Sequence, residues 1–106
     1  MRRVAVTGLG VISPLGNSAD ELFGNLVTGR SGVRRLDGDE YQRLTTSIAA
    51  PAAFDGTRYF DAPKLRMLDR VSQFALAAAR QAIGHAQLPV ADMDASRIGV
   101  FLGTGM

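Results

Sequence analysis

Two short apolar runs near the two ends of the chain constrain its fold more than any other feature. Residues 4–6 read Val-Ala-Val and residues 98–102 read Ile-Gly-Val-Phe-Leu, and a glycine-rich turn follows each run. Runs without polar alternation are typical of strands that are buried on both faces of an α/β sheet. Such strands need neighbouring strands and a helical layer on each side.

A first helix is expected soon after the first run. Ser18 and Glu21 have the spacing of a capping box, in which each side chain bonds a backbone N–H of the first helical turn. Gly29 is a natural C-terminal stop, because glycine adopts the left-handed conformation without a steric penalty. The pattern predicts a helix over about residues 19–28.

A second, longer helix is predicted over residues 63–85, where apolar side chains recur at helical spacing. Asp61, or the alanine after it, is expected to cap this helix, with a break near Asp69 and an end at Gly84. The alanine run at 77–79 favours helix and offers small side chains for close backbone packing.

Residues 30–61 are irregular, with a short strand or extended segment expected within 47–53. The order strand, helix, irregular region, helix, strand predicts parallel strands joined by right-handed crossovers. Two helices can hardly cover both faces of such a sheet, so the chain is expected to be part of a larger α/β unit.

Composition excludes several classes of function. The 106 residues carry a net charge of +2 with acids and bases interleaved, which argues against nucleic-acid binding. The sequence has no cysteine, so disulfides, thiolate metal sites and a cysteine nucleophile are excluded within it. Arg2 and Arg3 before an apolar run loosely imitate a signal peptide, but the run is short and interrupted by glycine. The expected location is therefore the cytoplasm.

The glycines and the single histidine do not indicate an active site. Gly8, Gly10 and Gly16 invite comparison with a dinucleotide-binding motif, but Ser13 stands where the third glycine belongs, so tight turns are the better explanation. His85 is expected near a helix end, where it can offset the helix dipole, and no nucleophile accompanies it.

Charged side chains gather at the start of the long helix, namely Lys64, Arg66, Asp69 and Arg70. They are explained either as a solvated face with weak local ion pairs or as a docking patch for an acidic partner, and the solvated face is the simpler interpretation. Residues 103–105 could allow close approach of a ligand or backbone, but no nucleophile, base or metal cluster accompanies them.

Four stretches resemble one family in order and in register. They are RVAVTGLGVISPLGN at 3–17, GRSGV at 29–33, LDRVSQFALAAA at 68–79 and RIGVFLGTG at 97–105. Together they are similar to the N-terminal portion of the elongating, KAS II-like β-ketoacyl-acyl-carrier-protein synthases, and the stretch at 68–79 is close to the version in type II polyketide and aryl-polyene ketosynthases. The resemblance covers nearly all of residues 1–106.

The resemblance implies a fold and a chemistry. The fold would be α/β, the N-terminal part of a thiolase-like αβαβα layered fold, usually in a homodimer. A cysteine thiolate would take an acyl group from the phosphopantetheine of acyl carrier protein, and two histidines would assist decarboxylation of malonyl-carrier protein. In the family these three residues lie downstream of the stretches matched here, so no catalytic residue and no directly bound cofactor is assigned.

Two further roles follow only from the resemblance. Met106 falls where relatives place the residue that gates the acyl pocket. Arg66, with Lys64 beside it, matches a basic region that relatives use to dock the acidic carrier protein. Met67 stands where some relatives carry another basic residue, which implies a weaker or shifted docking patch.

Three alternatives stay open at this point. The chain could belong to a non-catalytic subunit of the chain-length-factor type, which pairs with an active ketosynthase. It could be a small stand-alone interaction module, which would fold cooperatively as a monomer. A dinucleotide-binding fragment ranks last.

Overall fold

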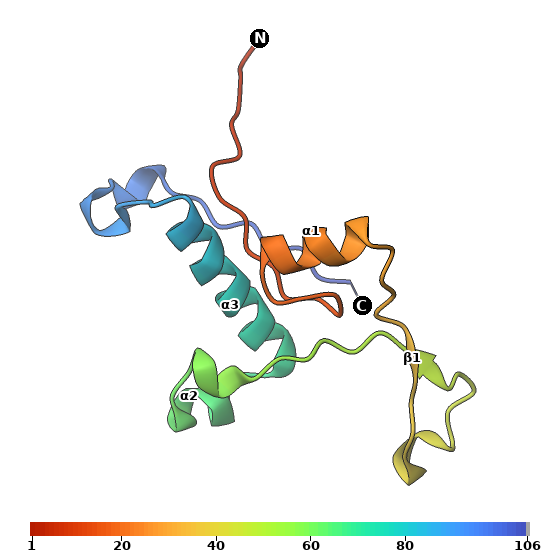
Figure 1. Cartoon of the computed structure of the whole chain (residues 1–106). Coiled ribbons are helices and arrows are strands. Elements are labelled where there is room, and N and C mark those ends of the chain that lie inside the picture. Colours follow the sequence, from red (N-terminus) through yellow and green to blue (C-terminus); the bar gives the residue numbers. More distant parts are fainter. Residues whose placement is uncertain (106) are drawn as a thin grey trace.

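The computed structural model describes residues 1–105 and contains three α-helices and one small sheet (Figure 1). The helices are α1 (Ala19–Val27), α2 (Ala62–Met67) and α3 (Arg70–His85). Strands β1 (Arg34–Arg35) and β2 (Ile48–Ala49) pair antiparallel. Four 3-10 turns complete the described elements: η1 (Asp39–Tyr41), η2 (Gly56–Arg58), η3 (Val90–Asp92) and η4 (Ala95–Arg97). The chain is thus mixed helix and strand, as expected.

The first predicted helix is confirmed as α1. Ser18 Oγ accepts the Glu21 N–H at 3.2 Å, and Glu21 Oε2 accepts the Asn17 N–H at 2.8 Å, one residue before the cap. The helix ends at Val27, and Gly29 follows in the left-handed conformation with φ of 70°. Local side-chain chemistry therefore sets both ends of α1.

The second predicted helix is confirmed as two helices, α2 and α3, separated at Leu68 and Asp69. Asp61 caps α2 through the Lys64 N–H at 3.0 Å, and Asp69 caps α3 through the Ser72 N–H at 2.7 Å. Because the Asp69 carboxylate satisfies a backbone donor that would otherwise lack a partner, a new helix starts at the expected break.

The predicted end of the long helix at Gly84 is wrong. Helix α3 continues through Gly84 to His85, and Ala86 is its C-cap. The residue with positive φ after the helix is Gln87, at 50°. Glycine inside the last turn costs some stability but does not end a helix whose neighbours are packed.

The predicted parallel strands are absent from the described part of the chain. Residues 4–6 and 98–102 carry no strand, and their side chains are exposed, Val4 to 93% and Phe101 to 97%. A strand is defined by hydrogen bonds to a partner, and within residues 1–105 neither run has one. The expected short strand within 47–53 does form, as β2, but it is only two residues long and its pairing is antiparallel.

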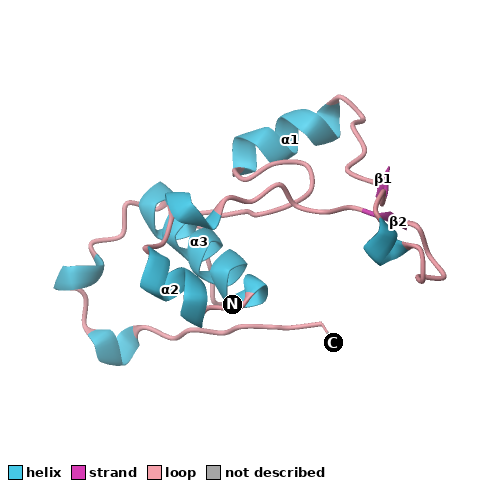
Figure 2. Ribbon diagram, turned by 90° about the horizontal axis from the view of Figure 1, so that it is seen from below, coloured by secondary structure: helices cyan, strands magenta, loops and turns pink. Residues whose placement is uncertain are grey.

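A small aromatic cluster between η2, α2 and α3 forms the core. Phe54 and Phe60 are 8% and 6% exposed, and Ala77 is fully buried. The Phe54 ring lies 5.1 Å from the Phe74 ring, edge to face, and 5.3 Å from the Tyr59 ring, stacked. This cluster fixes the position of α2 against the first turns of α3, on one side of the molecule (Figure 2).

The segment after the first apolar run packs directly on α3. A Cβ added to Gly8 would overlap the carbonyl oxygen of Ala82, and one added to Gly10 would overlap that of Ala78. The predicted close packing of small helix residues is therefore confirmed. The prediction that Gly8 and Gly10 serve tight turns is wrong: the α3 backbone leaves no room for a side chain at either position. The turn explanation holds for Gly16, whose φ is 154°.

The chain leaves much apolar surface uncovered. Its radius of gyration is 17.1 Å, whereas a compact domain of this length would have about 13 Å. Its accessible surface is 9053 Å², against about 5,700 Å² for a compact protein of this mass. The open shape counts against a stand-alone module and agrees with the expectation of a larger α/β unit.

Among residues 1–105, no helix combines the length and the apolar character that crossing a bilayer requires.

Candidate functional site

The most connected polar side chain belongs to Gln81, in the second half of α3. Its Oε1 accepts the Val11 N–H at 2.9 Å, and its Nε2 donates to the Asn17 carbonyl at 2.7 Å and to the Tyr59 hydroxyl at 3.1 Å. One half-buried amide thereby joins α3 to the N-terminal segment of residues 11–17 and to Tyr59. The sequence contains no local signal for this role, because all three partners are distant.

His85 lies one turn further along α3. Its Nδ1 accepts the Leu9 N–H at 3.0 Å. The structural interpretation of His85 is confirmed, because the side chain in the last turn of α3 binds the backbone of the N-terminal segment. His85 and Gln81 accept the N–H groups of Leu9 and Val11, respectively. These two hydrogen bonds hold the segment around Gly10 against α3.

A tight loop between this segment and α1 contains one unusual buried atom. Asn17 Nδ2 donates to the Ala53 carbonyl at 2.6 Å, while Asn17 Oδ1 is buried and has no partner among the described residues. Ser13 and Gly16 close the loop with paired backbone hydrogen bonds. The loop is a positioning element, since its polar groups bond one another and also Ala53, Asn25 and Gln81 of neighbouring segments.

The two residues expected to dock a carrier protein are both exposed, on α2. Leu65 between them points to the core and contacts Gly56. Successive helix residues are about 100° apart, so Lys64 and Arg66 are about 200° apart and lie on opposite flanks of α2. Neither side chain makes an ion pair or hydrogen bond within residues 1–105. Lys64 and Arg66 are therefore both exposed, but they do not form one continuous basic patch.

Two further arginines of α3 lie over aromatic rings. The Arg70 guanidinium carbon is 5.2 Å from the centre of the Phe54 ring and 4.8 Å from that of Phe74. Arg80 lies 5.0 Å from the centre of the Phe60 ring and also donates to the Tyr59 carbonyl. Both arrangements are cation–π contacts, which fix an otherwise mobile side chain.

Residues 102–104 line an apolar hollow of about 420 Å³ together with residues 10–12 and one face of α3. The α3 residues are Val71, Phe74, Ala75 and Ala78. No close approach forms at the glycines of 103–105 in the described part of the chain, because the space beside Gly103 and Gly105 is open. Met106, the predicted gate of an acyl pocket, lies outside the described residues.

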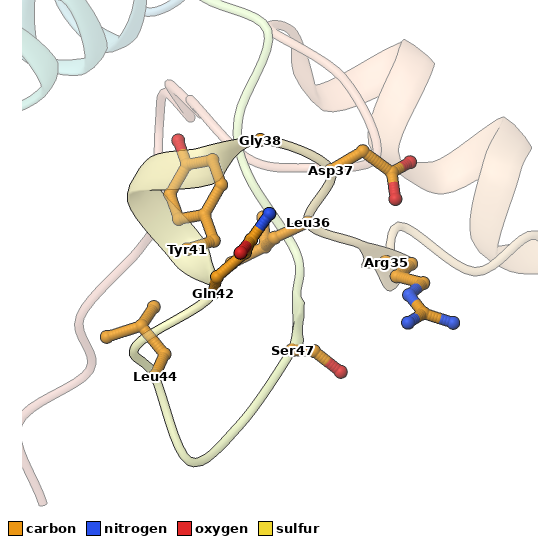
Figure 3. Close-up of a pocket in the computed structure, with 8 residues that line it drawn as sticks. All are labelled: Arg35, Leu36, Asp37, Gly38, Tyr41, Gln42, Leu44 and Ser47. Atoms are coloured by element: carbon orange, nitrogen blue, oxygen red, sulfur yellow. The ribbon is translucent and has the colours of Figure 1, made fainter.

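A second hollow, of about 480 Å³, lies inside the hairpin that contains β1 and β2 (Figure 3). Its lining includes Arg35, Asp37, Tyr41 and Ser47. Figure 3 shows these side chains spread around the loop and not converging on one point. The hollow therefore holds no arrangement of nucleophile, base and orienting group.

Three exposed carboxylates have perturbed acidity for local reasons. Hydrogen bonds from Thr57, Ser72 and Ser96 lower the pKa of Asp55, Asp69 and Asp94, respectively. The side-chain hydroxyl is the main cause at Asp55 and Asp94, and the backbone N–H is the main cause at Asp69. Each carboxylate caps a helix or helical turn, which is a structural use.

Residues 1–105 contain no cluster of histidine, cysteine and carboxylate side chains that could hold a metal ion. Two apolar runs without strand partners among these residues, and a helix packed on glycines, are features of one portion of a larger α/β unit.

Comparison with known proteins identifies the family. The model of the β-ketoacyl synthase N-terminal domain matches residues 1–106. The chain belongs to the β-ketoacyl synthase family, within that N-terminal domain.

The chain is also similar to several curated members. It is 39% identical over 106 residues to the 3-oxoacyl-[acyl-carrier-protein] synthase 2 of Coxiella burnetii. It is 37% identical over 109 residues to that of Synechocystis, and 33% identical over 106 residues to that of Staphylococcus aureus strain N315. Each match covers 99% of this chain but 26% of the relative, so the chain spans about a quarter of their length.

A solved structure agrees with this result. The crystal structure of a β-ketoacyl synthase from Burkholderia phymatum matches with a TM-score of 0.67 at 37% identity, over 82% of this chain and 22% of that one.

Proposed function

We propose that the 106 residues are the N-terminal portion of a longer β-ketoacyl-acyl-carrier-protein synthase with a thiolase-like αβαβα fold. The match of the family's N-terminal domain to residues 1–106 is the observation that supports this most strongly. The exposed runs at 4–6 and 98–102 support it as well, because strands in such a sheet would have partners on both sides.

The proposed reaction is a decarboxylative condensation. A cysteine thiolate attacks the acyl-carrier-protein thioester, and the phosphopantetheine thiol leaves. Malonyl-carrier protein then loses CO₂, and the electron pair of the broken bond forms an enolate. The enolate carbon attacks the acyl-cysteine thioester and expels the thiolate, which yields a β-ketoacyl chain lengthened by two carbons.

The present chain would not supply the reacting groups of that reaction. It has no cysteine, and its single histidine is engaged with the Leu9 backbone. We assign no catalytic residue to it. The complete enzyme would need no bound cofactor, since decarboxylation generates the carbanion and phosphopantetheine presents both substrates.

We propose that this portion contributes to docking of the carrier protein and to the shape of the acyl pocket. Lys64 and Arg66 are exposed cations without acidic partners in the described chain, which suits contact with an acidic carrier protein. Met106 would gate the acyl pocket, because a bulky side chain at that position limits the length of the acyl chain.

We further propose that the complete protein is a homodimer in the cytoplasm. The curated relatives are named for an acyl-carrier-protein substrate. The absence of cysteine in this portion is compatible with a reducing environment.

The test compares the complete protein with the 106-residue chain. Each is purified free of host synthase and incubated with acyl- and malonyl-carrier protein, and β-ketoacyl product is measured by mass spectrometry. We expect product from the complete protein and none from the chain alone. If the complete protein makes no product but stimulates a separate ketosynthase, the chain-length-factor alternative is correct.

A further inference from the structure

The exposed arginines of α3 differ in how their donors are used. Arg80 stacks on Phe60 and gives a hydrogen bond to the Tyr59 carbonyl. Arg70 stacks on two rings, Phe54 and Phe74, yet none of its five N–H donors has an acceptor within residues 1–105. Arg80 therefore has a hydrogen-bond acceptor inside the chain. Arg70 is held in position by stacking, but its N–H donors have no acceptor within residues 1–105.

The acidic neighbour of Arg70 does not change this conclusion. The Asp69 carboxylate accepts the Ser72 N–H at 2.7 Å and makes no ion pair with Arg70. In the described part of the chain, the one ion pair joins Arg58 and Asp55, at 3.9 Å. The guanidinium of Arg70 thus keeps its full charge available to a partner.

Arg70 also lies close to the residues proposed for docking. It is four residues after Arg66, so the two Cα atoms are at most about 14 Å apart. A protein partner of ordinary size covers about 800 Å² on each side, which is wide enough to contact both residues.

We infer that Arg70 is a further docking residue for the acidic carrier protein, with its guanidinium held ready by Phe54 and Phe74. This inference rests on the proposed function. A guanidinium matches a carboxylate with two parallel hydrogen bonds. Because stacking has already restricted the side chain, binding loses less conformational entropy than it would at a free arginine.

The inference also modifies the expected docking patch. Lys64 and Arg66 lie on opposite flanks of α2 and cannot both face one helix of a partner. The corner at which α2 turns into α3 offers Arg66 and Arg70 instead, with Met67 exposed at the turn. Arg70 is then the cation that compensates for the missing basic residue at position 67.

The test measures the dissociation constant of the complete protein for its holo-carrier protein, by calorimetry, at 50 and 500 mM NaCl. Arg70→Met keeps apolar bulk over the two rings but removes the charge. We expect it to bind about two- to fivefold more weakly at low salt, the size typical of one exposed ion pair. The deficit should vanish at high salt, where the screening length is only a few ångströms.

Two variants serve as controls. Arg70→Lys keeps the charge but loses the paired hydrogen bonds and the ring stacking, so it should bind with a strength between those of wild type and Arg70→Met. Arg80→Met removes a matched cation from the same helix, and it should lower the melting temperature without a salt-dependent loss of binding. Circular dichroism verifies folding for every variant.

The inference is overturned if Arg70→Met binds carrier protein as tightly as wild type at low salt. It is also overturned if Arg70→Met binds more weakly at both salt concentrations and has a lowered melting temperature. If Arg70→Met does not fold, Arg70→Gln, which also removes the charge, takes its place: weaker binding at low salt only supports the inference, and binding equal to wild type refutes it. Failure of the wild-type complete protein to bind or elongate carrier protein would instead refute the proposed function.

Discussion

At the scale of single residues, a few small or polar side chains decide how the N-terminal segment lies on α3. Gly8 and Gly10 leave no room for a Cβ against the helix backbone, and Gln81 and His85 bind the N–H groups of Val11 and Leu9. These contacts join residues about 70 positions apart, which is why the sequence suggested turns for the glycines and a dipole effect for His85.

A substitution at Gly10 tests this packing. In the complete protein, Gly10→Ala forces a methyl group onto the Ala78 carbonyl, and we expect a loss of about 1–3 kcal/mol in the free energy of unfolding by urea. Gly84→Ala is the matched control, since the space beside Gly84 is open and alanine favours helix by about 0.5–1 kcal/mol. Unchanged stability of Gly10→Ala would show that the segment is not packed as described.

Asp69 makes the start of α3 sensitive to acid. Its pKa is lowered because the Ser72 N–H bonds the ionised carboxylate. The resulting stabilisation is therefore present above the ordinary aspartate value of about 4 and is lost as the pH falls through the lowered pKa. We expect the Ser72 amide shift, followed by NMR in the 106-residue chain from pH 6 to 2, to titrate in this range.

The variant Asp69→Asn separates the cap from its charge. The amide oxygen can still accept the Ser72 N–H, but it does not titrate, so the Ser72 shift should become nearly independent of pH. A titration of equal size in this variant would assign the acid sensitivity to another group.

At the scale of elements, helices were predictable from sequence, whereas of the expected strands only the short one within 47–53 forms. Ser18, Asp61 and Asp69 cap helices through residues only three positions away, so local sequence contains the whole signal. A strand depends on a partner backbone that can be anywhere in the protein. The runs at 4–6 and 98–102 have strand composition but no partner among residues 1–105.

The candidate site was predictable to a smaller extent. Lys64 and Arg66 are exposed on α2. The packing of Leu65 against the core shows that they lie on opposite flanks of the helix. The stacking of Arg70 on Phe54 and Phe74 joins Arg70 to a ring 16 positions away and follows no motif, so no local pattern distinguishes Arg70 from the other charged residues near it.

Hydrogen exchange tests the status of the apolar runs. In the isolated 106-residue chain, the amides of 4–6 and 99–102 should exchange at nearly unprotected rates, because they have no hydrogen-bond acceptor within residues 1–105. In the complete protein the same amides should be strongly protected by neighbouring strands. Buried Ala77 of α3 provides an internal reference. Protection of both runs in the isolated chain would contradict the structure.

At the scale of the whole molecule, an open shape follows from a shortage of covering elements. Buried residues are confined to the small cluster around Phe54, Phe60 and Ala77, and apolar side chains remain exposed at both ends of the chain. The hydrophobic effect alone would not hold these 106 residues as one cooperative unit. Their stability is expected to come from the remaining part of the synthase.

The most direct test is the nucleotide sequence of the reading frame beyond the codon for Met106. We expect an open frame that encodes a cysteine motif followed by two histidine motifs, which together would complete a condensing enzyme. A frame that closes at once, or one that continues without a cysteine motif, would contradict the assignment of this chain to an active β-ketoacyl synthase.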